Sequence, residues 1–137
     1  MESSIFLPIM TLAGWTLLVL MVIPFRRFKA GFAGEVRTGD FILGESPHVP
    51  GWVQLANRNF MNLLEVPVLF YLVGLIAYLT EQVTLLTLWL AWLFVAARVL
   101  HSVVHLTYNR VAHRLIFFTV ANLLLIAFWL QVFWGLI

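Results

Sequence analysis

The clearest structural signal in the chain lies in residues 57–106, which read NRNFMNLLEVPVLFYLVGLIAYLTEQVTLLTLWLAWLFVAARVLHSVVHL. The segments 57–79 and 81–106 are mostly apolar, and each reaches the length of about 20 residues that a helix needs to cross a hydrocarbon core of roughly 30 Å. They are joined almost directly through Thr80 and Glu81. Thr80 is expected to cap the incoming helix, and Glu81 suits its positive end. We therefore expect a tight antiparallel hairpin of two transmembrane helices.

Two further apolar segments flank this hairpin, at residues 5–27 and 113–135. The intervening residues 28–56 hold five of the eight glycines and two of the five prolines, a density that prevents one continuous helix. Large apolar side chains are expected to keep this loop at the membrane surface; these are Phe32, Phe41, Ile42 and Trp52. The sequence therefore predicts one all-α integral membrane domain over residues 1–137, a bundle of four transmembrane helices.

The composition agrees with this class, since 63% of the residues are hydrophobic, 10% are charged and the mean hydropathy is +1.00. A soluble domain is about a quarter charged, so an ordinary globular, disordered or nucleic-acid-binding domain is excluded. The net charge of +2 rests on too few charged groups to indicate a nucleic-acid partner. The chain has no cysteine, which excludes disulfides, thiolate metal sites and a cysteine nucleophile. The expected surrounding is the lipid bilayer.

The basic residues indicate the orientation in the membrane, because Lys and Arg are enriched near cytoplasmic span ends. They gather around two of the three connections, and they are Arg26, Arg27, Lys29, Arg37, Arg58, Arg110 and Arg114. The opposite side has none. We expect the loop over residues 28–56 to be cytoplasmic and both termini to lie on the other side. The brevity of the chain suggests a bacterial inner membrane.

Two short polar stripes interrupt the apolar hairpin. Arg58, Asn62 and Glu65 are four and three residues apart, so they fall within an arc of roughly 60° on one helix face. Arg98, His101 and His105 form an equally narrow stripe on the following span. Glu65 and Arg98 lie at similar distances from Thr80 along the chain. We predict that these two side chains form an ion pair.

In and beside these stripes, arginines and histidines outnumber the single carboxylate of Glu65. This excess of cationic groups predicts a pocket for an anion. One alternative is that the polar groups only hold the bundle together, because lipid cannot drive helix association by hydrophobic burial. A second is that His101 and His105, four residues apart, bind a metal or a haem. Two ligands do not make a metal site, so we expect no metal here.

The same residues resemble a known family. The string from Arg58 to Pro67 resembles the Arg-x3-Asn-x2-Glu-x-x-Pro signature of the MAPEG family, the membrane-associated proteins in eicosanoid and glutathione metabolism. The string from Ala97 to Arg114 is similar to the family's Arg-x2-His/Tyr-x3-Tyr segment and the arginines after it, closest to the microsomal prostaglandin E synthase and glutathione transferase branch. Three positions depart from the family pattern: His105 and Val66 stand where many members have tyrosine, and Pro67 comes one residue early.

The resemblance implies a homotrimer that binds glutathione between subunits near the cytoplasmic face. Carried over by position, the residues that hold the carboxylates, amine and backbone of glutathione are Arg26, Arg58, Asn62 and Glu65. Arg98 matches the buried pairing arginine, and His101 matches a binding-site position. Arg114 matches the arginine that stabilises the thiolate. His105 and Arg110 complete the candidate binding set.

These observations predict a membrane-bound glutathione transferase or peroxidase, with glutathione as cosubstrate. Arg114 would activate the thiol for attack on a hydrophobic electrophile or a lipid hydroperoxide that arrives from the bilayer. Two other functions stay open at this point. One is a non-catalytic membrane protein of the same fold, either a lipid-binding trimer or an accessory subunit of a larger assembly. The other is a histidine-ligated redox protein.

Overall fold

The computed structural model describes residues 2–137, and every regular element in that part of the chain is helical. Four helical stretches are long and apolar enough to cross a membrane, as predicted, and the second of them consists of two helices in succession. The long helices are α1 (Phe6–Phe32), α2 (Gly51–Leu64), α3 (Pro67–Leu79), α4 (Leu85–Leu106) and α5 (Val111–Leu136). Two short 3₁₀ helices are η1 (Glu2–Ile5) and η2 (Thr38–Phe41). The chain is thus an all-α, multi-pass membrane protein.

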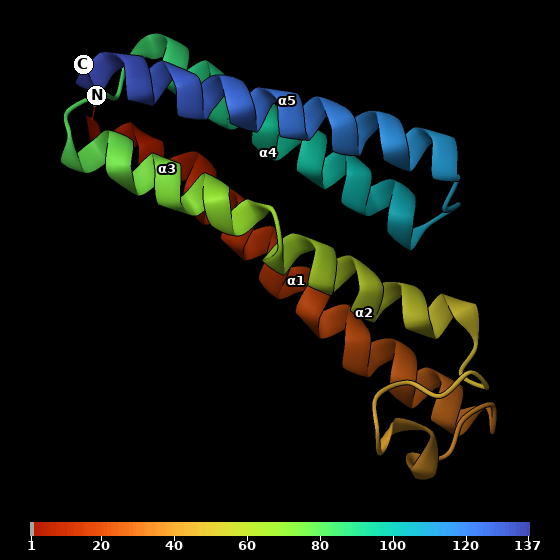
Figure 1. Ribbon diagram of the computed structural model, residues 1–137. Coiled ribbons are helices and arrows are strands. Elements are labelled where there is room, and N and C mark those ends of the chain that lie inside the picture. The colour runs from red at the N-terminus through yellow and green to blue at the C-terminus, as the bar shows by residue number, and fades with distance from the viewer. Residues whose placement is uncertain (1) are drawn as a thin grey trace.

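The helices run alternately up and down, so the two kinds of connection lie at opposite ends (Figure 1). The N-terminus, the C-terminus and the α3–α4 turn share one end. The α1–α2 loop and the α4–α5 turn share the other, which we call the loop end. Toward the loop end the α1–α2 pair diverges from the α4–α5 pair (Figure 1). The basic residues at the ends of α1, α2, α4 and α5 therefore belong to this end.

The core lies between the helices and is filled by aromatic and aliphatic side chains. Phe70 of α3 stacks on Phe94 of α4 with ring centroids 4.7 Å apart, and it meets Phe128 of α5 edge-on at 6.1 Å. All three rings are fully buried. Many other large apolar side chains are exposed along the outside of the helices, for example Leu17 and Ile126. Such a surface suits lipid, because a soluble monomer rarely exposes large continuous apolar areas.

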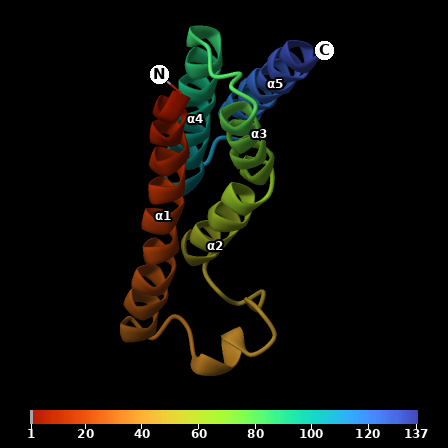
Figure 2. The same ribbon diagram turned by 90° about the vertical axis from the view of Figure 1, so that its left-hand side faces the viewer.

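The second span is interrupted at Glu65 and Val66, where a single helix over residues 57–79 was expected. Pro67 causes the break, since it has no N–H to donate and its ring disfavours helical geometry in the preceding residues. α2 therefore ends at Leu64, and Pro67 opens α3 at a position that suits proline. Figure 2 shows the change of direction between the two helices. α2 also begins earlier than expected, at Gly51, so the loop proper is residues 33–50.

The cap of the third span is Thr84, and the prediction of Thr80 was wrong. The Thr84 hydroxyl accepts from the Thr87 N–H at 3.2 Å, and the Thr84 N–H donates to the Thr87 hydroxyl at 3.1 Å. Thr80 instead ends α3, where its hydroxyl donates to the Ile76 carbonyl. The turn is longer than expected, since α4 begins at Leu85. Glu81 lies in this turn with a positive φ of 58°, outside the first turn of α4 where it was expected.

Candidate functional site

Polar residues of α2, α4 and α5 meet at the loop end in a cleft of about 310 Å³, which we call the polar cleft. Its lining residues are Leu55, Asn57, Arg58, Met61, Asn62, Glu65, His105, Asn109 and Arg114. A second cleft of about 240 Å³ shares Asn62 and Arg114 with it, and we call this the adjoining cleft. The remaining residues that line the adjoining cleft are His101, Val111, Leu115 and Phe118. Arg114 and Asn62 thus stand where a polar space meets a mostly apolar one.

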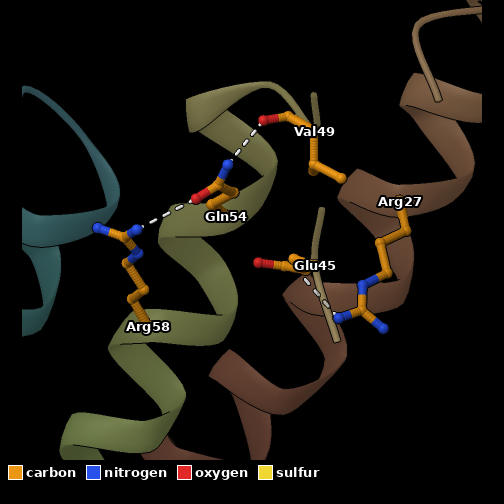
Figure 3. A network of polar contacts seen from close by, with 5 residues as sticks. All are labelled: Arg27, Glu45, Val49, Gln54 and Arg58. Atoms are coloured by element: carbon orange, nitrogen blue, oxygen red, sulfur yellow. Dashed lines mark hydrogen bonds and ion pairs between the residues drawn. The ribbon is translucent and has the colours of Figure 1, made fainter. Parts of the chain in front are cut away.

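The α2 side of the polar cleft is the predicted stripe of Arg58, Asn62 and Glu65. One terminal nitrogen of Arg58 donates to the side-chain oxygen of Gln54 at 3.2 Å, and the Gln54 amide donates to the Val49 carbonyl at 2.8 Å (Figure 3). The Asn62 side chain donates to the Arg58 carbonyl at 3.1 Å. Gln54 therefore orients Arg58, a role that the sequence pattern alone did not suggest.

The opposite side is formed by Arg114 and the α4–α5 turn. Nη1 of Arg114 donates to Oδ1 of Asn109 at 2.8 Å, while its Nε is buried and has no hydrogen-bond partner within residues 2–137. Asn109 has a positive φ of 49°, which asparagine tolerates better than most residues, and its N–H donates to the Val104 carbonyl at 2.8 Å. The turn that ends α4 thus also positions the guanidinium of Arg114. Sequence reasoning did not place Asn109 in the candidate site, although an asparagine soon after the end of a helix is a known signal for such a turn.

His101 and His105 lie one turn apart on α4, and both are buried. Their ring centroids are 5.8 Å apart, and Nδ1 of each ring has no hydrogen-bond partner in the described chain. His105 lines the polar cleft and His101 lines the adjoining cleft. Within residues 2–137 no group of three His, Cys, Asp or Glu residues lies close enough to hold a metal ion. Both histidines can instead serve as hydrogen-bonding groups of the two clefts.

Arg98 lies behind the clefts, and the predicted ion pair between Arg98 and Glu65 was wrong. The Arg98 side chain is fully buried and donates from Nη2 to the Asn62 carbonyl at 2.5 Å. That carbonyl is among the last four of α2, which have no partner inside the helix. Glu65 is exposed and lines the polar cleft. Within the described residues, the one ion pair is between Arg27 and Glu45 at 3.1 Å.

Two more predicted residues lie outside both clefts. Arg26 donates from its two terminal nitrogens to the carbonyls of Trp52, at 2.6 Å, and Leu106, at 2.9 Å, so it ties α1 to the start of α2 and the end of α4. Arg110 is exposed and precedes α5. The structure therefore brings together six of the predicted residues and leaves Arg26, Arg98 and Arg110 outside the cleft linings. The six are Arg58, Asn62, Glu65, His101, His105 and Arg114.

The charges of the polar cleft define what it can bind. Arg58 and Arg114 supply two guanidinium groups and Glu65 supplies one carboxylate, with amide and imidazole groups between them. This set is complementary to a small polar molecule that carries more than one negative charge and one positive charge. The fold and the site together define a four-span membrane protein with a cleft of mixed charge, lined by two arginines and one glutamate, at one end of the bundle.

Comparison with protein families names the class more closely. The family model described as MAPEG family matches residues 5–134, and the chain belongs to this family. It is thus an integral membrane protein of the group concerned with eicosanoid and glutathione metabolism. Searches of curated proteins and of solved structures give no match.

Proposed function

We propose that the protein is a membrane glutathione transferase or peroxidase whose glutathione site is the polar cleft. The observation that carries this proposal is that Arg58, Arg114 and Glu65 line one cleft. Glutathione has two carboxylates, one ammonium group and a thiol, so the signs of its charges match those of the cleft. Family membership supports the same choice of cosubstrate.

Each lining residue has a role in this proposal. Arg58 binds a carboxylate of glutathione, and Glu65 binds its ammonium group. Asn62 and His105 have the donors and acceptors that a peptide backbone requires. Arg114 lies beside the thiol and favours its ionised form, because a nearby guanidinium lowers the pKa of a thiol from about 8.5. Asn109 holds Arg114 in place.

The thiolate is then the nucleophile in either reaction. With an electrophile, a sulfur–carbon bond forms and the leaving group departs with its electron pair. With a hydroperoxide, a sulfur–oxygen bond forms as the oxygen–oxygen bond breaks, and the alkoxide takes a proton to give an alcohol. A second glutathione reduces the resulting sulfenic acid, giving glutathione disulfide and water. The apolar residues of the adjoining cleft provide a place for the hydrophobic cosubstrate.

The assembly and orientation belong to the same proposal. We infer a homotrimer from family membership. The basic loop end faces the cytoplasm, and both termini lie on the other side, because Lys and Arg gather at cytoplasmic ends. We also propose that this membrane is a bacterial inner membrane.

The test uses the purified protein in detergent. Glutathione is added, and the ultraviolet absorbance of the thiolate is measured together with the thermal unfolding midpoint. The native protein is expected to show both a thiolate signal and stabilisation, whereas Arg114→Ala is expected to lose the thiolate signal by tenfold or more. Arg110→Ala removes the same charge outside the clefts and is the matched control. If the native protein shows neither the thiolate signal nor stabilisation by glutathione, the proposal is refuted.

A non-catalytic role is the second candidate, and one observation favours it. Arg26 and Arg98, two residues of the predicted binding set, donate to backbone carbonyls and thus hold helices together. In a purely structural protein the remaining polar groups would act in the same way. Stabilisation by glutathione without thiolate formation would identify a binding protein instead of an enzyme.

A further inference from the structure

A cleft larger than the polar and adjoining clefts lies elsewhere, between the last turns of α1 and the folded loop that follows. It has a volume of about 860 Å³ and shares no lining residue with the polar cleft. We call it the elbow cleft. Its apolar lining residues are Ile23, Pro24, Phe28, Phe32, Val36 and Phe41. Its volume is large enough for part of a lipid-sized molecule.

Two arginines line this apolar cleft, and among the described residues no acidic side chain does. The guanidinium of Arg27 lies over the Phe41 ring at 4.7 Å, and its Nη2 pairs with Glu45 at 3.1 Å (Figure 3). The Glu45 side chain is only 9% exposed and is not among the residues that line the cleft. Arg37 is exposed, and its side chain makes no hydrogen bond or ion pair within residues 2–137. Two cations with unused donors therefore border an apolar space.

The loop that closes the elbow cleft is a defined structure. The two carboxylate oxygens of Asp40 accept from the Arg37 N–H at 2.8 Å and from the Ser46 hydroxyl at 3.0 Å. The Ser46 N–H donates to the Asp40 carbonyl at 2.8 Å. These two hydrogen bonds to the carboxylate hold the pKa of Asp40 below its ordinary value. The loop thus places Arg37 and Phe41 in fixed positions beside α1.

The elbow cleft lies where the boundary between hydrocarbon and water is expected from the end of the apolar run of α1. It lies at the end of the first span, where the apolar run of α1 meets the basic residues of the loop end. Phe28 is 68% exposed and Phe32 is 92% exposed beside it. A lipid at this boundary presents both its acyl chain and its charged headgroup, and basic residues near the membrane surface attract anionic lipids.

We propose that the elbow cleft binds an anionic glycerophospholipid. The phosphate lies against Arg27 and Arg37, and an acyl chain runs along Phe28, Phe32 and Phe41. This site is separate from the proposed glutathione site, so either proposal can fail alone. The single-sign charge of the lining residues selects an anionic headgroup over a zwitterionic one.

The test measures lipid binding by native mass spectrometry on the full chain, purified in detergent and freed of lipid. Phosphatidylglycerol and phosphatidylcholine with the same acyl chains are compared, and inorganic phosphate is added in a separate arm. Arg37→Gln is the main variant, since its side chain makes no contact that the fold requires. Lys29→Gln is the matched control, because Lys29 is an exposed cation in the last turn of α1 that does not line the cleft.

The native protein is expected to bind phosphatidylglycerol more tightly than phosphatidylcholine. Arg37→Gln is expected to weaken phosphatidylglycerol binding about fivefold, which is the size of one basic residue's attraction to an anionic lipid surface. Lys29→Gln is expected to change it less than twofold. Equal loss in both variants would show unspecific attraction and overturn the proposal. Equal binding of the two lipids would overturn the proposal as well, and so would displacement of the lipid by inorganic phosphate alone. It would also be overturned if lipid-free Arg37→Gln loses an oligomer that the lipid-free native protein forms, because the weaker lipid binding would then follow from lost assembly.

Discussion

Replacement of Glu65 by glutamine separates a binding role from a structural one. The Glu65 side chain is exposed in the polar cleft and has no basic partner within ion-pair distance among residues 2–137. Its loss should therefore change the free energy of unfolding by no more than about 0.5 kcal/mol. A carboxylate that binds the ammonium group of glutathione contributes about 1.5–3 kcal/mol through a charged hydrogen bond. Glu65→Gln should thus weaken glutathione binding by roughly ten- to a hundredfold.

Two measurements on the same detergent sample decide the outcome. Titration calorimetry gives the glutathione affinity, and chemical denaturation gives the stability of the native and variant proteins. Glu81→Gln is the matched control, since Glu81 is an exposed glutamate at the opposite end of the bundle. A loss of about 3–5 kcal/mol in stability would mean that Glu65 is half of a buried ion pair, which would refute the reasoning. Unchanged glutathione affinity would refute the assignment of the ammonium group to Glu65.

Three further outcomes test the site, the helix contacts and the loop. Asn109→Gly keeps the positive φ but removes the acceptor of Arg114, so the thiolate signal should fall several-fold while glutathione affinity, measured by calorimetry, changes little. Thr87→Val removes bonds to the Gln82 carbonyl and to Gln131 of α5, and should cost about 1–3 kcal/mol in chemical denaturation. The pKa of Asp40 is lowered in the folded loop, so its ionised carboxylate stabilises the fold of this loop. This stabilisation is complete above the ordinary aspartate pKa of about 3.9 and disappears as the pH falls through the lowered value. Limited proteolysis within residues 33–50 should therefore accelerate at acid pH. At neutral pH the protease should cut the Asp40→Asn variant faster than the native protein.

The sequence was sufficient to predict the four spans because each is marked by length and hydropathy alone. The polar stripes were also predictable, since Arg58, Asn62 and Glu65 recur at helical spacing and the structure places all three in the polar cleft. Both signals depend on local periodicity. They require no knowledge of how two helices are rotated or tilted against each other.

Partners across helices were harder to predict. The expected pairing of Glu65 with Arg98 assumed that the second span was one straight helix, so that distance from Thr80 measured depth. Pro67 invalidates that assumption, because the helix stops at Leu64 and Glu65 leaves the helical path with a ψ of −97°. The role of Asn109 was missed for a related reason, since its contact with Arg114 depends on the path of a turn.

The break before Pro67 also accounts for the charge balance of the candidate site. In a continuous helix the Asn62 carbonyl would accept a hydrogen bond from the helix itself, and the buried Arg98 would need another partner. Glu65 would be the candidate, because it lies about as far from Thr80 along the chain as Arg98 does. Because α2 ends early, the free carbonyl of Asn62 accepts from Arg98 instead. Glu65 is thereby left to the polar cleft, where it is the one acidic lining residue of the described chain, beside Arg58 and Arg114. One proline thus produces a cleft of mixed charge, and mixed charge is what distinguishes a site for a zwitterionic peptide from a site for a simple anion.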